Sequence, residues 1–318
     1  MSALYLNEAD VRELLDMELA IDVIEQAFQQ WANDRASNVP RQRAKAPGAI
    51  LHSMCATADY LGLVGWKVYT TTRGGAKFLV GVSRQSDGEL LALIEANYLG
   101  QLRTGAASGV ATSYMARPDS KVVGMFGSGQ QARTQLKAVC TVCQIEVVEI
   151  YSRNEERRRT FAEEMSEYCN TRVIAVHSPE EAAAEKDIVI CASTSRAPLF
   201  DGRVLDEGTH INAVGSNFLE KTELDLTTIQ RSDIIVCDSI AQCRLEAGDF
   251  VAALDSGITD WQLMHELADV VTGRTPGRAA REQITLFKSV GLALEDLALA
   301  GKLFELAEKE GFGTRLPF

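Results

Sequence analysis

The stretch KVVGMFGSGQQA at residues 121–132 decides the fold. Its first six residues form a short apolar run typical of a buried strand, and the glycine-rich segment after them opens an amphipathic pattern typical of a helix. A GxGxxA motif by itself is weak, but one that links a strand to a helix has the context of a dinucleotide-binding turn. The sequence therefore predicts a Rossmann unit that opens at Lys121.

Each residue type in this turn has a physical task. Gly127 permits the tight turn, Gly129 lets the backbone approach a pyrophosphate, and Ala132 lets the helix pack closely on the strand. The helix N-terminus offers N–H groups and the positive end of the helix dipole to the phosphates. A glycine-rich turn without a ligand is the alternative interpretation. We expect the cofactor to contact Gly127, Ser128, Gly129, Gln130, Gln131 and Ala132.

The end of the second expected strand, residues 146–151, bears on the choice of cofactor. An NAD-specific site usually places an acidic residue there, whereas this sequence has Ser152 and Arg153. A hydroxyl group and a planar cation suit a 2′-phosphate. The sequence thus favours NADP(H) over NAD(H). The alternative is that Arg153 belongs to the solvated charges that continue through residues 155–159.

From residue 117 onward, short apolar strands alternate with amphipathic helices. Such a series of βαβ units implies a parallel sheet with helices on both faces. We therefore predict an α/β fold, with a Rossmann dinucleotide-binding domain over residues 117–295. The expected strands are 121–126, 146–151, 172–176, 187–192, 210–214 and 233–237.

The first third of the chain has a different pattern, which predicts an α+β domain with an antiparallel sheet over residues 1–116. Residues 37–48 break the pattern and are expected to form a loop. The long apolar helix near the C-terminus, about 296–318 in the domain assignment, is expected to pack back on this domain. Helices are expected at 8–15, 21–31 and 98–116, and strands at 49–55, 61–70, 78–84 and 90–95.

Composition excludes several classes of protein. The 32 basic and 44 acidic residues give a net charge of −12, which repels nucleic acid and anionic lipid, so neither is an expected partner. The N-terminus has no basic segment followed by an apolar one, and no apolar run approaches the ~18 residues of a membrane span. Seven scattered cysteines are typical of a reducing compartment. We predict a cytoplasmic location.

No metal site is expected. Cys140 and Cys143 form a CxxC pattern, but it lies inside a helical pattern without a second pair, so burial in an apolar core is the simpler interpretation. The histidines lack ligand spacing and neighbouring cysteines. They are His52, His177, His210 and His265.

Three cations stand where core packing does not explain them. Arg41 lies in the expected loop, Lys67 interrupts an apolar strand, and Arg103 precedes a helix of small residues. A lysine inside an apolar strand is costly to bury without an anion. Together the three could clamp a carboxylate, although each alone could be a surface charge. Replacing Arg103 is then expected to weaken catalysis and hardly change stability.

Four motifs together make the chain resemble the ornithine cyclodeaminase/mu-crystallin family. They are LRTGAA at 102–107, GSGQQA at 127–132, VGSN with KTELD at 214–225, and FKSVG with ED at 287–296. The resemblance covers nearly the whole chain. It implies a homodimer whose first domain forms both the dimer interface and the substrate site, with the cofactor on the second domain.

The resemblance also assigns residues to the site. The ligands of the substrate carboxylate fall on Arg41, Lys67 and Arg103, and Arg43 could replace Arg41 after a shift of two residues. Ser289 and Gly291 are expected near the nicotinamide end of the cofactor. The loop after the fourth parallel strand, Ser193, Thr194 and Ser195, is expected to touch the cofactor, and Met54 is a candidate for the pocket wall.

The chain departs from the cyclodeaminase pattern at one position. The family's cyclodeaminases have an aspartate after the fifth parallel strand that handles the distal amine of the substrate, and Asn217 occupies that position here. An asparagine is neutral and cannot act as a general base. This favours simple reduction over cyclodeamination, with Lys67, Arg103 and Asn217 as the expected catalytic residues.

The sequence thus predicts an NAD(P)H-dependent reductase of a small α-imino acid, such as Δ1-pyrroline-2-carboxylate or a related ketimine, reversible as an amino-acid dehydrogenase. Orientation of the C=N carbon and a proton for the imine suffice for that chemistry. Two alternatives stay open. One is a cyclodeaminase, and the other is a ligand-binding protein of the mu-crystallin kind.

Overall fold

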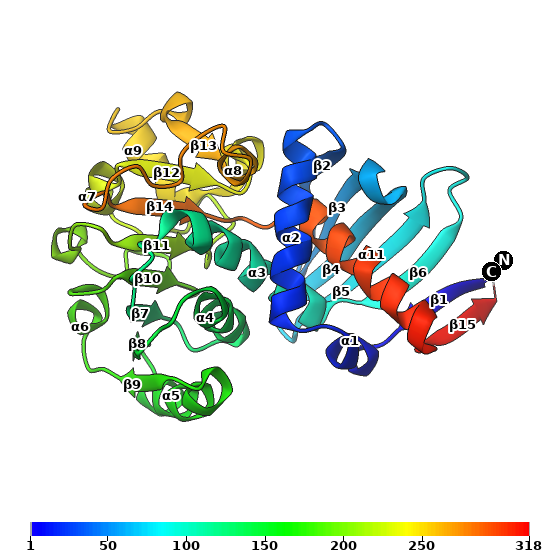
Figure 1. Cartoon of the computed structure of the whole chain (residues 1–318), viewed down its shortest axis with the longest axis horizontal. Helices are drawn as coiled ribbons and strands as arrows, with labels where there is room; N and C mark the ends of the chain where they lie inside the picture. Colours follow the sequence, from blue (N-terminus) through cyan, green and yellow to red (C-terminus); the bar gives the residue numbers. More distant parts are fainter. Residues whose placement is uncertain (1, 318) are drawn as a thin grey trace. The chain divides into compact units, whose positions relative to one another are not determined.

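A computed structural model describes residues 2–317, which divide into two units (Figure 1). The first unit contains the residues up to Thr104 together with those from Gly291 onward, and the second contains Gly105 to Val290. The division lies inside helix α3 (Asn97–Met115) rather than at residue 116, because the apolar helix runs on without a break.

The first unit is built on a seven-stranded sheet in the order β15-β1-β6-β5-β4-β3-β2. All neighbouring strands in it are antiparallel except the pair β1 and β6. The strands are β1 (Ser2–Leu6), β2 (Ala36–Ala46), β3 (Ala49–Ala58), β4 (Leu63–Thr72), β5 (Gly75–Arg84), β6 (Leu90–Glu95) and β15 (Thr314–Pro317). The helices are α1 (Glu8–Leu14), α2 (Met17–Ala32) and α11 (Ala293–Glu310).

Local sequence fixes the helix ends. Asn7 and Asp10 form a capping box at the start of α1, and Asp16 accepts the N–H of Leu19 to cap α2. Gly311 ends α11 in the left-handed conformation, with φ of 77°. Helix α11 packs on β3 and β4 and against α2, so these helices cover one face of the sheet (Figure 1).

The expected loop at residues 37–48 is wrong, because this segment is strand β2. Pro40 made the segment unlike a strand, since proline cannot donate to the ladder. It is accommodated because β2 is the edge strand and because its register shifts between Val39 and Gln42. Strands β1 and β15, near the two ends of the chain, were not predicted.

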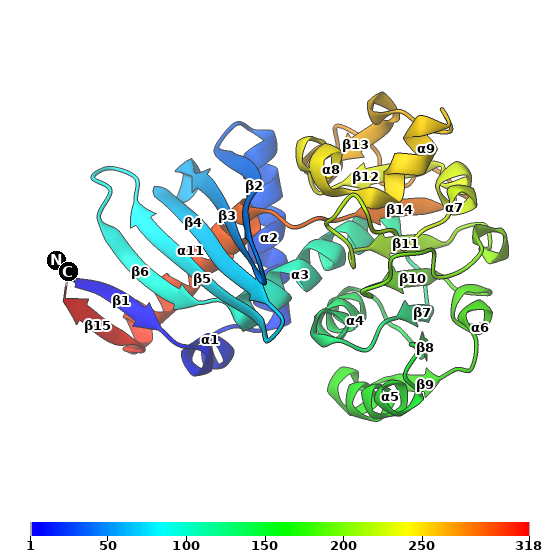
Figure 2. The same ribbon diagram turned by 180° about the vertical axis from the view of Figure 1, so that it is seen from behind.

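The other face of this sheet has no helix over it among residues 2–317 (Figure 2). Three large apolar side chains are nevertheless exposed on it, since Leu51, Trp66 and Leu79 are 45%, 36% and 39% exposed. Large apolar side chains gathered on an uncovered sheet face are typical of an interaction surface.

The second unit is an eight-stranded sheet in the order β13-β12-β14-β11-β10-β7-β8-β9, and every neighbouring pair is parallel. The predicted Rossmann-type fold is thereby confirmed. The strands are β7 (Val122–Phe126), β8 (Val147–Tyr151), β9 (Arg172–Ala175), β10 (Ile188–Cys191), β11 (His210–Ala213), β12 (Ile234–Cys237), β13 (Met264–Glu266) and β14 (Thr285–Lys288).

Both faces of this sheet are buried. Ile188 and Ile190 pack into one apolar core, and Val189 and Cys191 into the other, so β10 is a continuous apolar run rather than an alternating one. Helices α4 and α6 lie on opposite sides of the sheet (Figure 1). The main helices are α4 (Gln130–Val142), α5 (Glu155–Cys169), α6 (Pro179–Ala183), α7 (Leu226–Arg231), α8 (Ile240–Glu246), α9 (Val251–Asp255) and α10 (Leu267–Val271).

Strand order reverses between β7 and β10, which makes their carboxyl ends the switch point where such sheets bind ligands. Among residues 2–317, no helix is long and apolar enough to cross a bilayer.

Candidate functional site

A cavity of about 400 Å³ opens in the second unit at the carboxyl ends of β7, β8 and β10. Most of the residues predicted to bind a cofactor line it, although they come from three separate turns. The predicted residues among its walls are Gly127, Ser128, Gly129, Ser152, Arg153, Ser193, Thr194 and Ser195.

The two glycines of the turn fit a bound dinucleotide in different ways. Gly127 has φ of 109°, and a Cβ there would lie 2.3 Å from the carbonyl oxygen of Ala192, so no other residue is accommodated. A Cβ on Gly129 would meet no atom within 4 Å and would instead occupy the cavity. Gly129 is also the N-cap of the 13-residue helix α4 and brings no side-chain cap. The helix N-terminus can therefore receive phosphate oxygens.

The end of the cavity beside the turn after β8 has two guanidinium groups. Arg153 and Arg157 are both exposed and both line it, although the sequence indicated only Arg153. Ser152 Oγ lies 3.1 Å from Ser128 Oγ, which joins the second turn to the first. Arg158 is buried and donates to the carbonyl of Ser152 at 2.8 Å, so it supports the turn.

Other predicted cofactor residues lie outside the walls of this cavity. Gln130, Gln131 and Ala132 form the first turn of α4, and Ala132 is buried in the core as close packing requires. Ser289 donates to Asp238 Oδ2 at 2.9 Å. Gly291 belongs to the first unit. The roles expected of Ser289 and Gly291 at the cofactor stay predictions.

In the first unit, two predicted cations meet in one buried cluster. Lys67 Nζ donates to Asp296 Oδ1 at 2.7 Å, and Arg103 Nε reaches the same oxygen at 3.2 Å. Arg103 Nη1 also donates to Glu295 Oε2 at 2.6 Å. The side chains of Lys67 and Asp296 are 3% and 1% exposed. Glu295 and Asp296 belong to one of the four family motifs, but the sequence indicated no role for them, since acidic residues in the first turn of a helix are usually solvated.

Arg41 joins this cluster from β2. It is buried, and its Nη2 donates to the carbonyl of Gly291 at 3.2 Å. Arg43 follows two residues later and pairs in register with His52. Met54 pairs in register with Lys67 and is buried, so the two side chains share the face of the sheet that α11 covers. Both arginines therefore remain candidates for the carboxylate ligand.

Burial lowers the pKa of Lys67 to about 8, and the neighbouring Arg103 and Arg41 add to the lowering while Asp296 opposes it. Lys67 can therefore exchange a proton near neutral pH. The ion pairs also contradict the expectation that replacing Arg103 hardly changes stability. Removing Arg103 leaves Glu295 and Asp296 buried beside one fewer cation, which costs about 3–5 kcal/mol.

The sequence assigned no role to His52, but this residue lies beside the cluster. Its ring stacks on Tyr69 with centroids 4.1 Å apart, and its Nε2 lies 2.6 Å from Thr71 Oγ1. Burial, with Arg43 and Arg41 nearby, lowers the pKa of His52 to about 4. The imidazole is therefore neutral near pH 7 and adds no charge beside the cluster.

Asn217 lies in the second unit, in the loop after β11, and is half-buried. The residue before it, Ser216, is held by Lys288, which donates to the Ser216 carbonyl at 2.9 Å. Among residues 2–317, no group of three or more acidic, cysteine or histidine side chains is arranged to hold a metal ion.

Comparison with known proteins gives a consistent result. Residues 1–311 match the ornithine cyclodeaminase/mu-crystallin family. The Delta(1)-pyrroline-2-carboxylate reductase of Bacillus cereus is 32% identical, over 99% of this chain and 100% of that protein. The structure of the Thermococcus litoralis reductase of the same name, in complex with NADH and L-proline, is 36% identical, with a TM-score of 0.94 over 98% of this chain and 100% of that one.

A further solved structure is an archaeal alanine dehydrogenase dimer with bound NAD. It is 31% identical and has a TM-score of 0.94, with full coverage of both chains.

Proposed function

Because the chain belongs to the ornithine cyclodeaminase/mu-crystallin family, we propose that it is an NAD(P)H-dependent reductase of small α-imino acids. Its substrate is of the Δ1-pyrroline-2-carboxylate or ketimine type, and the reaction reverses as an amino-acid dehydrogenation. The observation that carries the proposal is the buried cluster of Lys67, Arg103 and Asp296, because a reductase of this type needs both a carboxylate ligand and a proton source.

The cluster binds the substrate through its charge. Arg41, Lys67 and Arg103 carry three positive charges against the two negative charges of Glu295 and Asp296. The five side chains thus keep one net positive charge, which suits a single substrate carboxylate. Asp296 and Glu295 hold the cations in fixed geometry, so little side-chain entropy is lost when the substrate binds.

Lys67 is the group that keeps the imine protonated. Its pKa of about 8 places it where it can give up a proton and recover one at neutral pH. A nicotinamide cofactor, when bound in the cavity of the second unit, supplies the hydride. Arg103 and Arg41 hold the carboxylate, which orients the C=N carbon of the imino acid.

Asn217 favours reduction over cyclodeamination. Cyclisation requires the distal amine of a diamino acid to lose a proton before it attacks, and an amide cannot take that proton. Asn217 can donate and accept hydrogen bonds, which suits a cyclic or uncharged side chain on the substrate.

NADP(H) is the proposed preferred cofactor, and NAD(H) remains usable. The similar reductase and dehydrogenase structures hold NADH and NAD. In this chain, Arg153 and Arg157 both line the cavity at the position suited to a 2′-phosphate.

A homodimer is proposed because the uncovered sheet face of the first unit exposes the large apolar side chains Leu51, Trp66 and Leu79. The alanine dehydrogenase structure is a dimer.

All seven cysteines are free thiols, which supports a reducing compartment such as the cytoplasm.

The test compares two reactions. Purified protein is incubated with Δ1-pyrroline-2-carboxylate and NADPH or NADH, and separately with ornithine and catalytic NAD(P)⁺, and proline is measured in both. We expect consumption of reduced cofactor equal to the proline formed in the first reaction, and little proline in the second. Proline and ammonia from ornithine at a matching rate would indicate a cyclodeaminase. Saturable binding of imino acids without turnover would indicate a ligand-binding protein.

A further inference from the structure

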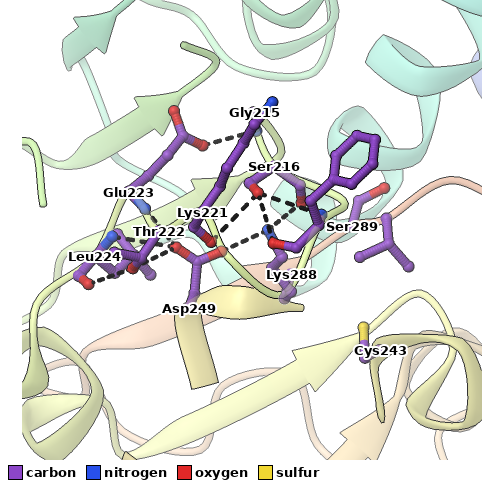
Figure 3. A network of polar contacts seen from close by, with 12 residues as sticks. Gly215, Ser216, Lys221, Thr222, Glu223, Leu224, Cys243, Asp249, Lys288 and Ser289 are labelled. Carbon is purple, nitrogen blue, oxygen red and sulfur yellow. Dashed lines mark hydrogen bonds and ion pairs between the residues drawn. The ribbon is translucent and has the colours of Figure 1, made fainter. Parts of the chain in front are cut away.

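Three charged side chains are buried together in the second unit, and the reaction as described does not use them. They are Glu223, Asp249 and Lys288, and none is more than 4% exposed (Figure 3). Two of them belong to motifs that the sequence singled out, KTELD and FKSVG, whereas nothing in the sequence indicated Asp249.

Glu223 joins two loops that follow neighbouring strands of the parallel sheet. Its Oε1 accepts the backbone N–H of Ser193, in the loop after β10, at 2.7 Å. Its Oε2 accepts the N–H of Gly215, in the loop after β11, also at 2.7 Å. Ser193 is a wall of the cofactor cavity. One carboxylate therefore sets the spacing between a cavity wall and the loop that carries Asn217.

Asp249 and Lys288 bind the backbone on both sides of this loop, at Glu223 and Leu224 and at Ser216. Asp249 Oδ1 accepts the N–H of Glu223 at 2.6 Å and that of Leu224 at 3.2 Å, and Figure 3 shows it between this backbone and Lys288. Lys288 Nζ lies 2.7 Å from Asp249 Oδ2 and donates to the carbonyl of Ser216 at 2.9 Å. The ammonium group of Lys288 thus contacts both Asp249 and Ser216, the residue before Asn217.

The backbone approaches so closely that the network has one arrangement. A Cβ on Gly215 would lie 2.4 Å from the Glu223 carboxylate and from the carbonyl oxygen of Ser193. A Cβ on Gly248, next to Asp249, would lie 2.0 Å from the carbonyl oxygen of Lys221. A closely packed network with this many hydrogen bonds is rigid.

We propose that Glu223, Asp249 and Lys288 are positioning residues for hydride transfer, which hold the Ser193 wall and the Asn217 loop in the arrangement that the reaction needs. This inference rests on the proposed function. Two carboxylates accept four backbone N–H groups. Glu223 accepts those of Ser193 and Gly215. Asp249 accepts those of Leu224 and of Glu223 itself. The lysine balances one of the two charges.

The network is expected to affect only one end of a bound dinucleotide. The adenosine end of the cavity, with Ser128, Ser152 and Arg153, has its own hydrogen bonds and none to these three residues in the part of the chain that the structure describes. Loosening the network should therefore disturb the reactive end of a bound dinucleotide and leave its adenosine half in place.

The experiment replaces Lys288 by Met and Glu223 by Gln. Lys186→Met is the control, because Lys186 is also buried and ion-paired, with Glu149 of β8, but its hydrogen bonds reach neither loop. We measure kcat and KM for pyrroline-2-carboxylate and NADPH, the Kd of NADPH and of ADP-ribose, and the unfolding temperature. Lys288→Met should lower kcat about 100-fold and raise the Kd of NADPH, while the Kd of ADP-ribose stays within about threefold.

Glu223→Gln should give a smaller loss, because its one amide oxygen keeps one of the two N–H bonds. Equal kcat in Lys288→Met and Lys186→Met, or equal weakening of NADPH and ADP-ribose binding, would overturn the proposal. If Lys288→Met does not fold, Glu223→Gln and Asp249→Asn provide the same comparison. If the wild-type protein turns over no imino acid, the proposed function fails, and the two Kd values still test the positioning role.

Discussion

The two buried charge clusters of this chain are built from the same residue types but serve different ends. In the first unit, the oxygens of Glu295 and Asp296 contact side-chain cations that a strand and a helix supply. In the second unit, the oxygens of Glu223 and Asp249 contact mainly backbone N–H groups.

The difference separates a site for a ligand from a scaffold. Side-chain cations in excess over their carboxylates leave a net positive charge, and a substrate carboxylate can complete it. Carboxylates that bind backbone amides fix the course of loops and have no capacity for a further anion. Similar burial of charge in the two units therefore predicts different consequences of mutation.

The largest effect is expected from Arg103→Ala. Loss of a charge-assisted contact to the substrate carboxylate should lower kcat/KM by about 10- to 150-fold, from about 1.5–3 kcal/mol. Because Glu295 and Asp296 lose a partner, the free energy of unfolding should also fall by about 3–5 kcal/mol. Steady-state kinetics and chemical denaturation measure the two effects. Arg281→Ala, which removes an exposed pair with Asp119, is the control and should change neither. Normal kinetics in a folded Arg103→Ala protein would contradict the assignment of the clamp.

The glycines of the turn separate fold from binding in the second unit. Gly127→Ala places a side chain at positive φ against the Ala192 carbonyl, so it should cost at least about 1–3 kcal/mol of stability. Gly129→Ala has room for its methyl group, so the unfolding temperature should fall much less than in Gly127→Ala, while the KM for the cofactor rises about 10-fold. Thermal unfolding and kinetics on both variants give the comparison. An unchanged KM in Gly129→Ala would show that the cradle is not used.

The pH dependence of Lys67 distinguishes activity from stability. Reduction needs its proton, so kcat/KM should be constant below a pH of about 8 and fall about 10-fold per unit above it. The folded pKa of Lys67 is below its unfolded value of about 10.4, so between these values the unfolded state binds more protons. The contribution of Lys67 to stability therefore rises with pH in that window. Lys67→Met should abolish this rise, and a wild-type rate that increases through pH 8 in the reductive direction would argue against the role.

The smallest effect is expected at the exposed end of the cavity. Arg153→Ala should raise the KM for NADPH about 10-fold and hardly change that for NADH, because only NADPH carries the 2′-phosphate. Arg157→Ala should act in the same direction. Arg159→Ala, on the same helix but paired with Glu155 outside the cavity, is the control. A wild-type preference for NADH would defeat the NADP proposal outright.

Much of the second unit could be predicted from sequence. The six strands expected between residues 121 and 237 match β7 to β12 within one or two residues at each end. Two further strands, β13 and β14, were not predicted. The resemblance to the family agrees with the match over residues 1–311.

By itself, the sequence determined the Rossmann unit, the glycine turn and the family, because apolar periodicity and the residues of a tight turn act over a few neighbouring positions. Only the tertiary structure decided what balances the buried charges. Asp296 lies 229 residues from Lys67, and Asp249 lies 39 residues from Lys288, so no local pattern relates them. A buried charge requires a partner in space, whose place in the chain is set by the packing of strands and helices.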